Sequence, residues 1–118
     1  MLAMTKLASL TDLNFHHVLT ATPGTALVFF TAPNCGACRS LKLALGKYLH
    51  SYPATLSVFE VDAVHNSALV NALEVFHLPA LFLYVAGHYH CELHSEPLPA
   101  HLHRAIQTAL SLPAQEEP

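Results

Sequence analysis

Two cysteines in the first third of the chain have the spacing that disulfide chemistry needs. Cys35 and Cys38 are separated only by Gly36 and Ala37, and a helix is expected to begin at or near Cys35. Free N–H groups and the positive dipole end of a helix favour an anion, so a thiol pKa there can fall from about 8.5 to roughly 3.5–7.5. Cys38 would lie one turn further on the same face, close enough to form a disulfide. Cys35 would attack a substrate disulfide, and Cys38 would resolve the mixed disulfide.

A structural or metal-binding role is the alternative for this pair. A structural zinc site usually has four ligands, often from two CxxC-like pairs. The chain holds three cysteines, and the third, Cys91, stands alone. We therefore favour redox cycling and expect neither a metal nor a cofactor at the pair.

A buried strand and a long helix would position the two cysteines. Residues 26–31 are an apolar run with Val and two Phe, which suits a strand buried on both faces. Pro33 and Asn34 are turn residues that end it. A helix is predicted over about 35–50, and Pro53 would end it. Its apolar face is formed by Leu41, Leu45, Tyr48, Leu49 and Tyr52.

Strands and helices alternate along the rest of the chain. Further strands are expected at Lys6 to Ser9, Leu56 to Asp62, Ala80 to Ala86 and His88 to Leu93. One helix is expected after a cap at Leu10-Thr11-Asp12, with an apolar face at Leu13, Phe15, Val18 and Leu19. Another is expected after a cap at Asn66-Ser67, with Leu69, Ala72, Leu73 and Phe76. Pro97 and Pro99 would introduce the last helix, which bears Leu102, Ala105, Ile106, Ala109 and Leu110.

This alternation predicts an α/β fold. The order β, α, β, α, β, α, β, β, α implies parallel pairing, and the closing hairpin adds antiparallel strands. We expect a central mixed sheet flanked by helices on both faces. The 118 residues would form one domain, 1–118, with its core over about 6–111 and a disordered tail at 112–118.

Composition restricts the partners. More than half of the residues are hydrophobic, and the formal net charge is −3. This balance gives no reason to expect nucleic acid or a membrane as a partner, and no apolar run approaches the roughly 20 residues of a membrane span. No signal peptide is visible, so we expect a cytoplasmic protein; a mature periplasmic form stays an alternative. We also expect the protein to be a monomer.

From about Lys6 to Leu110 the chain resembles a thioredoxin. The residues that carry the resemblance are Leu10-Thr11-Asp12, Phe15, Cys35-Gly36-x-Cys38, Val58 to Asp62, Leu78-Pro79 and Gly87. It implies the thioredoxin fold, with Cys35 as nucleophile, Cys38 as resolving cysteine, and Gly36 and Ala37 in supporting positions. It also implies a cis bond before Pro79.

Five positions depart from the family pattern. Thioredoxins usually read Trp-Cys-Gly-Pro-Cys, whereas this chain has Asn34 for the Trp and Ala37 for the Pro. Phe29 stands where the family has a buried Asp that helps to deprotonate the resolving cysteine. Ala80 and Ser95 replace a common Thr and a common Gly. The resemblance implies a substrate groove lined by Asn34, His77, Leu78, Ala80 and Ser95; for His77 an ordinary loop position is an equal alternative.

Glu60 is the candidate for the missing proton acceptor. By family position it would lie beneath the dithiol, and it could act directly or through water. The alternative is a carboxylate at the strand end that faces only solvent.

Ten histidines are many for this length. His88 and His90 would share one face of their strand, with Cys91 on the other face and His94 nearby. A metal site there is an alternative, but the spacing does not show a convergent ligand set. We expect Cys91 to be a small buried hydrophobic residue.

The sequence thus predicts a thiol–disulfide oxidoreductase that reduces or exchanges disulfides in protein substrates. It would depend on an upstream reductase. The alternative from another class is a redox-inactive binding module that docks a protein, or that holds a metal or cluster through its CxxC.

Overall fold

A five-stranded sheet forms the centre of the protein. The structure, a computed structural model, describes residues 7–52 and 56–118. The elements are β1 (Ala8–Ser9), α1 (Phe15–Ala21), β2 (Thr25–Thr31), α2 (Gly36–Ser51), β3 (Leu56–Asp62), α3 (Ser67–Ala72), β4 (Ala80–Val85), β5 (His88–Leu93) and α4 (Pro99–Leu110). This is the predicted order. Lys6 and Pro53, which enter two of the predicted boundaries, lie outside the described residues.

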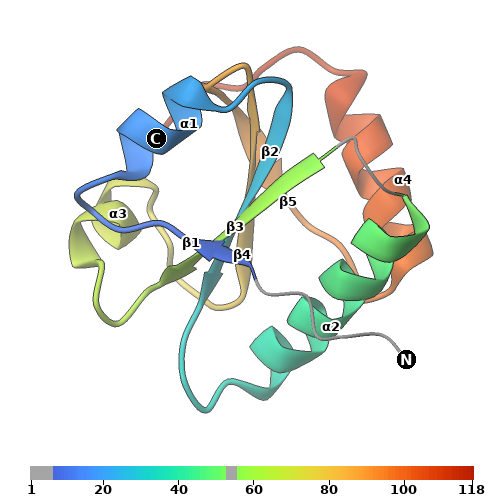
Figure 1. Ribbon diagram of the computed structural model, residues 1–118, viewed down its shortest axis with the longest axis horizontal. Coiled ribbons are helices and arrows are strands. Elements are labelled where there is room, and N and C mark those ends of the chain that lie inside the picture. The colour runs from blue at the N-terminus through green and yellow to red at the C-terminus, as the bar shows by residue number, and fades with distance from the viewer. Residues whose placement is uncertain (1–6, 53–55) are drawn as a thin grey trace.

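The sheet is mixed, as predicted. Its strand order is β1-β3-β2-β4-β5; β1 and β2 run parallel to β3, β4 is antiparallel to β2, and β5 is antiparallel to β4. Four strands, β1, β2, β3 and β5, therefore end at one edge of the sheet, where β4 begins (Figure 1). We call this edge the dithiol edge, because Cys35 and Cys38 follow β2 there.

Helices cover both faces of the sheet, with α1 and α3 on one side and α2 and α4 on the other (Figure 1). Alternation along β2 supplies both cores: Leu27 and Phe29 pack on the α2 and α4 side, whereas Val28 and Phe30 pack on the α1 and α3 side. All four side chains are buried, so the prediction of a strand buried on both faces is confirmed.

The two predicted helix caps form differently from our expectation. Asn14, not Leu10 to Asp12, is the residue before α1. Asp12 instead accepts a hydrogen bond from the N–H of Leu69 in α3, at 2.9 Å, and its own N–H donates to Asn66 Oδ1 at 2.9 Å. Asn66 makes no side-chain cap of its own helix. An acceptor 57 residues away thus satisfies a free N–H of the first turn of α3.

Two exposed apolar residues that were predicted on helix faces lie outside the helices. Leu13 precedes α1, and Phe76 follows α3, which ends at Ala72; both are exposed. Glu74 adopts φ +52°, in the left-handed region, which ends the helical course before Phe76.

An irregularity in β5 changes the predicted facing of the histidines. Leu83 pairs with Cys91 but Tyr84 pairs with Tyr89, which leaves His90 as an extra residue. His90 Nε2 lies 2.7 Å from the Ala109 carbonyl oxygen of α4, while Cys91 packs in the core beneath the same helix. The expectation that strict alternation separates His90 from Cys91 is therefore wrong.

The chain after α4 returns to the outer strand. The N–H of Gln115 donates to the carbonyl of His90 at 2.7 Å. Residues 112–118 are all exposed, and their disorder stays a prediction.

Candidate active site

Cys35 and Cys38 form a disulfide at the start of α2, with Cα atoms 5.2 Å apart. Cys35 is the N-cap residue, in an extended conformation, and its Sγ accepts a hydrogen bond from the N–H of Cys38 at 3.1 Å. In the reduced protein, the same helix terminus would present N–H groups and positive dipole charge to a Cys35 thiolate. The expected position of the pair at a helix N-terminus is confirmed.

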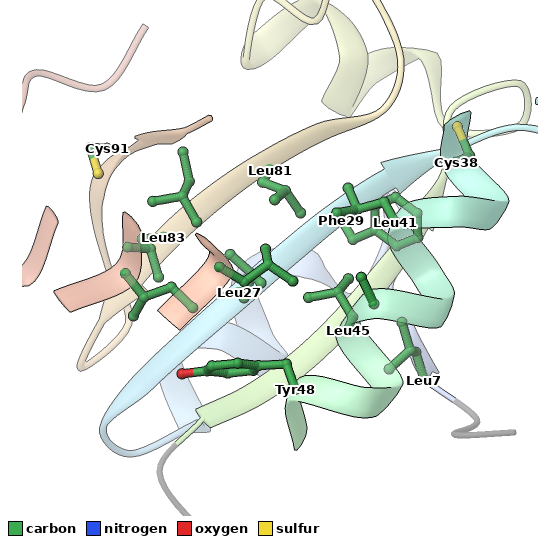
Figure 2. Close-up of a cluster of buried hydrophobic side chains, with 14 residues drawn as sticks. Leu7, Leu27, Phe29, Cys38, Leu41, Leu45, Tyr48, Leu81, Leu83 and Cys91 are labelled. Atoms are coloured by element: carbon green, nitrogen blue, oxygen red, sulfur yellow. The ribbon is translucent and has the colours of Figure 1, made fainter. Parts of the chain in front are cut away.

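The two sulfur-bearing residues differ in their access to solvent. Cys35 is half-buried, whereas Cys38 is only 2 % exposed. Figure 2 shows Cys38 at one end of the core cluster beneath α2, with Phe29 and Leu41 next to it along that cluster. An incoming disulfide can therefore reach Cys35 more readily than Cys38.

The turn from β2 into α2 places Cys35 at the dithiol edge. Pro33 and Asn34 follow the strand, and Asn34 adopts φ +60°, a left-handed conformation that asparagine tolerates better than most residues. Asn34 is exposed next to Cys35, as a residue of the predicted groove should be.

A second loop reaches the dithiol edge just before β4. The peptide bond between Leu78 and Pro79 is cis, which confirms the prediction for that bond. Ala80 then begins β4 and pairs with Phe30 of β2. This pairing brings the loop beside the strand that leads to Cys35.

The other predicted groove residues differ in exposure. His77 is exposed, Leu78 is half-buried and packs against both cores, and Ala80 is buried. Ser95 follows β5, and its hydroxyl donates to the Glu96 carbonyl at 2.8 Å. All lie in or next to loops of the dithiol edge; that they bind substrate stays a prediction.

A pocket of about 360 Å³, with several charged side chains in its lining, adjoins Cys38. It is lined by Ser9, Thr31, Ala32, Pro33, Cys38, Arg39, Lys42, Glu60 and Asp62. Lys42 Nζ lies 3.2 Å from one oxygen of Glu60 and 3.4 Å from the other. The side chain of Glu60 thus reaches the pocket that Cys38 lines, and it does not face solvent alone.

Sequence reasoning had not singled out Lys42, Arg39 or Asp62. Lys42 lies four residues after Cys38, so helical spacing alone could have placed it on the same face of α2. At the pocket rim, a hydrogen bond from His65, at 2.8 Å, lowers the pKa of the Asp62 carboxyl and keeps that group ionised.

The third cysteine belongs to another part of the core. Cys91 lies at the far end of the cluster from Cys38 (Figure 2). It is buried and free, and burial raises the pKa of its thiol. The prediction of a buried hydrophobic role for Cys91 is confirmed. Within residues 7–52 and 56–118, no three His, Cys, Asp or Glu side chains gather as a metal site would require.

A mixed sheet flanked by helices, with the Cys35–Cys38 disulfide at the N-terminus of α2, defines a thiol–disulfide redox protein. The chain belongs to the thioredoxin family, because the family model Thioredoxin matches residues 6–108. It is also similar to a thioredoxin from Griffithsia pacifica, at 26% identity over 76 residues, which cover 64% of this chain and 70% of that protein. None of the helices in the described part of the chain is long and apolar enough to cross a membrane.

Proposed function

We propose that this protein reduces or exchanges disulfides in protein substrates. The observation that carries the proposal is the pairing of a half-buried Cys35 at a helix N-terminus with a buried Cys38 in disulfide contact. The first sulfur is available for attack on a large substrate, and the second is sheltered until it is needed.

In the proposed reaction, the Cys35 thiolate attacks one sulfur of a substrate disulfide. The substrate S–S bond breaks, a mixed disulfide forms, and the leaving thiolate takes up a proton. Cys38 then gives up its proton and attacks Cys35 Sγ, which releases the second substrate thiolate. The substrate gains two electrons and two protons, and Cys35 and Cys38 end as a disulfide.

Glu60 is the proposed acceptor of the Cys38 proton. Phe29 cannot accept a proton, whereas Glu60 lines the pocket beside Cys38 and is held there by Lys42. The pocket is large enough for water, which could carry the proton between the two groups.

The proposal also covers the source of electrons, the compartment and the partners of the protein. Each turnover leaves an oxidised pair, so an upstream dithiol reductase must supply two electrons. A reducing compartment such as the cytoplasm suits this cycle. We further propose a monomer that binds neither nucleic acid nor membrane.

An insulin-reduction assay with dithiothreitol as the electron source tests this function. The wild-type protein should accelerate precipitation of the insulin B chain, and the Cys35→Ser variant should not. A wild-type protein without effect would support the redox-inactive binding module instead.

A further inference from the structure

The last residues of the chain cross the outer strand of the sheet. We call residues 112–117 the strap; they follow α4, which packs on one side of the sheet. In the middle of the strap, the N–H of Gln115 donates to the His90 carbonyl oxygen at 2.7 Å. The strap is therefore attached to the outer strand β5 by a backbone hydrogen bond.

The end of the strap lies near the opposite side of the sheet. Burial, and then the negative charge of Glu117, raise the pKa of Tyr84. Tyr84 packs on the side that α1 and α3 cover, and Figure 1 draws the C-terminus over α1. The strap thus begins on the α4 side, bonds to β5 at its midpoint and ends near the side of the sheet that α1 covers.

A pocket of about 430 Å³ lies between the first part of the strap, α4 and β5. The strap supplies Leu112, Pro113 and Gln115 to its lining. Cys91 of β5 also lines this pocket, although the residue is only 7% exposed. One wall of the pocket beside a free thiol is therefore made by the strap.

His90 holds the strap and the end of α4 at the same point. Its ring Nε2 lies 2.7 Å from the Ala109 carbonyl oxygen in the last turn of α4. Its own carbonyl oxygen accepts the hydrogen bond from Gln115. Because His90 directly precedes Cys91, release of Gln115 would open the pocket next to the thiol.

A third accessible thiol would interfere with thiol–disulfide exchange. If the Cys91 thiolate attacked a disulfide, that S–S bond would break, a mixed disulfide would form on Cys91 and a thiolate would leave. Cys91 lies at the far end of the core cluster from Cys38, so neither of the other two cysteines is placed to resolve such a product (Figure 2). Burial also raises the pKa of the Cys91 thiol, which lowers the fraction of reactive thiolate.

We propose that the strap is a cover that keeps Cys91 out of thiol–disulfide exchange, and that release of Gln115 from His90 opens it. In the closed form, the strap completes the wall of the pocket and restricts access to the thiol. In the open form, reagents reach Cys91 through the pocket. This inference goes beyond the proposed function, because it concerns a thiol outside the Cys35–Cys38 pair.

Alkylation of the oxidised protein tests the proposal, because Cys91 is then the one free thiol among the three cysteines of the chain. N-ethylmaleimide should label the wild-type protein slowly. Gln115→Pro removes the donor N–H and should raise the labelling rate about fivefold, as expected when one hydrogen bond is lost from the closed form. A freshly purified chain that ends at Ala114 should show an increase at least as large. Mass spectrometry locates the label.

Gln115→Ala is the matched control, because it removes the same side chain and keeps the N–H. It should be labelled as slowly as the wild type. Equal rates in the wild type, Gln115→Pro and the shortened chain would overturn the inference, as would an equal rise in Gln115→Ala. A rise that is matched by a loss of global stability, measured by thermal unfolding, would also overturn it. Insulin reduction should be the same in Gln115→Pro and the wild type, so a failure of the proposed function would appear in that assay and not in the labelling rates.

Discussion

Glu60 lies directly opposite Phe29 in the parallel register of β2 and β3. A carboxylate on β3 thus stands beside the position on β2 where the family has its buried Asp. Both residues belong to the side of the sheet that α2 covers, and Glu60 and Cys38 line one pocket. This relationship supports the proposal that Glu60 takes the place of the missing acid group.

Glu60→Gln should slow resolution of the mixed disulfide and leave the initial attack by Cys35 nearly unchanged, because the two steps use different thiols. General-base assistance is typically worth about 10²–10⁴-fold, and transfer through water would give less. Stopped-flow measurement of both steps provides the test. The defect should shrink at alkaline pH, where solvent removes the thiol proton unaided.

Glu92→Gln is the control for charge removal, since Glu92 is an exposed carboxylate on β5. It should affect neither step. An unchanged resolution rate in Glu60→Gln would eliminate Glu60 and leave water or the Cys35 thiolate as the proton acceptor.

The order of the cysteines gives a second prediction. Cys35 should react with iodoacetamide near neutral pH, and Cys38 much more slowly, since Cys38 is only 2% exposed in the disulfide form and lies behind Cys35 at the start of α2. Cys38→Ser should accumulate mixed disulfides with substrate, whereas Cys35→Ser should not. Trapping on non-reducing gels with mass spectrometry identifies the linked residue. Equal trapping by both variants would show that the assignment is wrong.

Ala37→Pro should shift the reduction potential of the pair. Ala37 lies in the first turn of α2, where proline is tolerated and fixes φ. We expect a more reducing protein, by analogy with the family motif; each 30 mV would correspond to ~1.4 kcal/mol. Redox titration against glutathione measures the shift. A potential equal to that of the wild type would contradict this role for position 37.

Tyr84→Phe should stabilise the protein by about 1–2 kcal/mol, because a buried hydroxyl without a hydrogen bond is unfavourable. Within residues 7–52 and 56–118, the Tyr84 hydroxyl is buried and lacks such a partner. Urea unfolding at neutral pH measures the change. Tyr89→Phe is the comparison, since Tyr89 is only half-buried and should give a smaller gain. A loss of stability in Tyr84→Phe would mean that the hydroxyl is bonded in solution.

The same substitution should alter the alkaline stability. Burial, and then the nearby Glu117 and Tyr89, raise the pKa of Tyr84 above its ordinary value of 10.0. A raised folded-state pKa contributes stability that is present below the unfolded pKa and is lost as pH rises through the folded value. The unfolding free energy should therefore fall above about pH 10, and fall less steeply in Tyr84→Phe.

Local patterns were sufficient for the element order and for the dithiol. The apolar run of β2, the periodic face of α2 and the turn at Pro33 each depend on neighbours in sequence, and each appears in the structure as predicted. The same patterns could not give the direction of the Glu60 side chain. Its contact with Lys42 joins two different elements, and only the packed arrangement of α2 on β3 decides it.

The incorrect predictions for Leu13, Phe76 and His90 have the same origin, because local patterns do not include contacts between different elements. Periodicity placed Leu13 and Phe76 on helix faces. Asp12, which was expected to cap the first helix, instead bonds to Leu69 of α3, and Glu74 adopts a left-handed conformation after the end of α3. Strict alternation likewise cannot reveal the extra residue at His90, because it is defined by pairing with β4.

The return of the chain after α4 has a consequence for handling the protein. β5 is the outermost strand on its side of the sheet, and the Gln115 N–H occupies the carbonyl of the extra residue His90. Unpaired backbone N–H and C=O groups on an outer strand can pair with a strand of another chain. Irregular pairing and a covering segment both make such pairing less favourable. Removal of residues 112–118, or a tag that pulls them away, should therefore increase aggregation on storage.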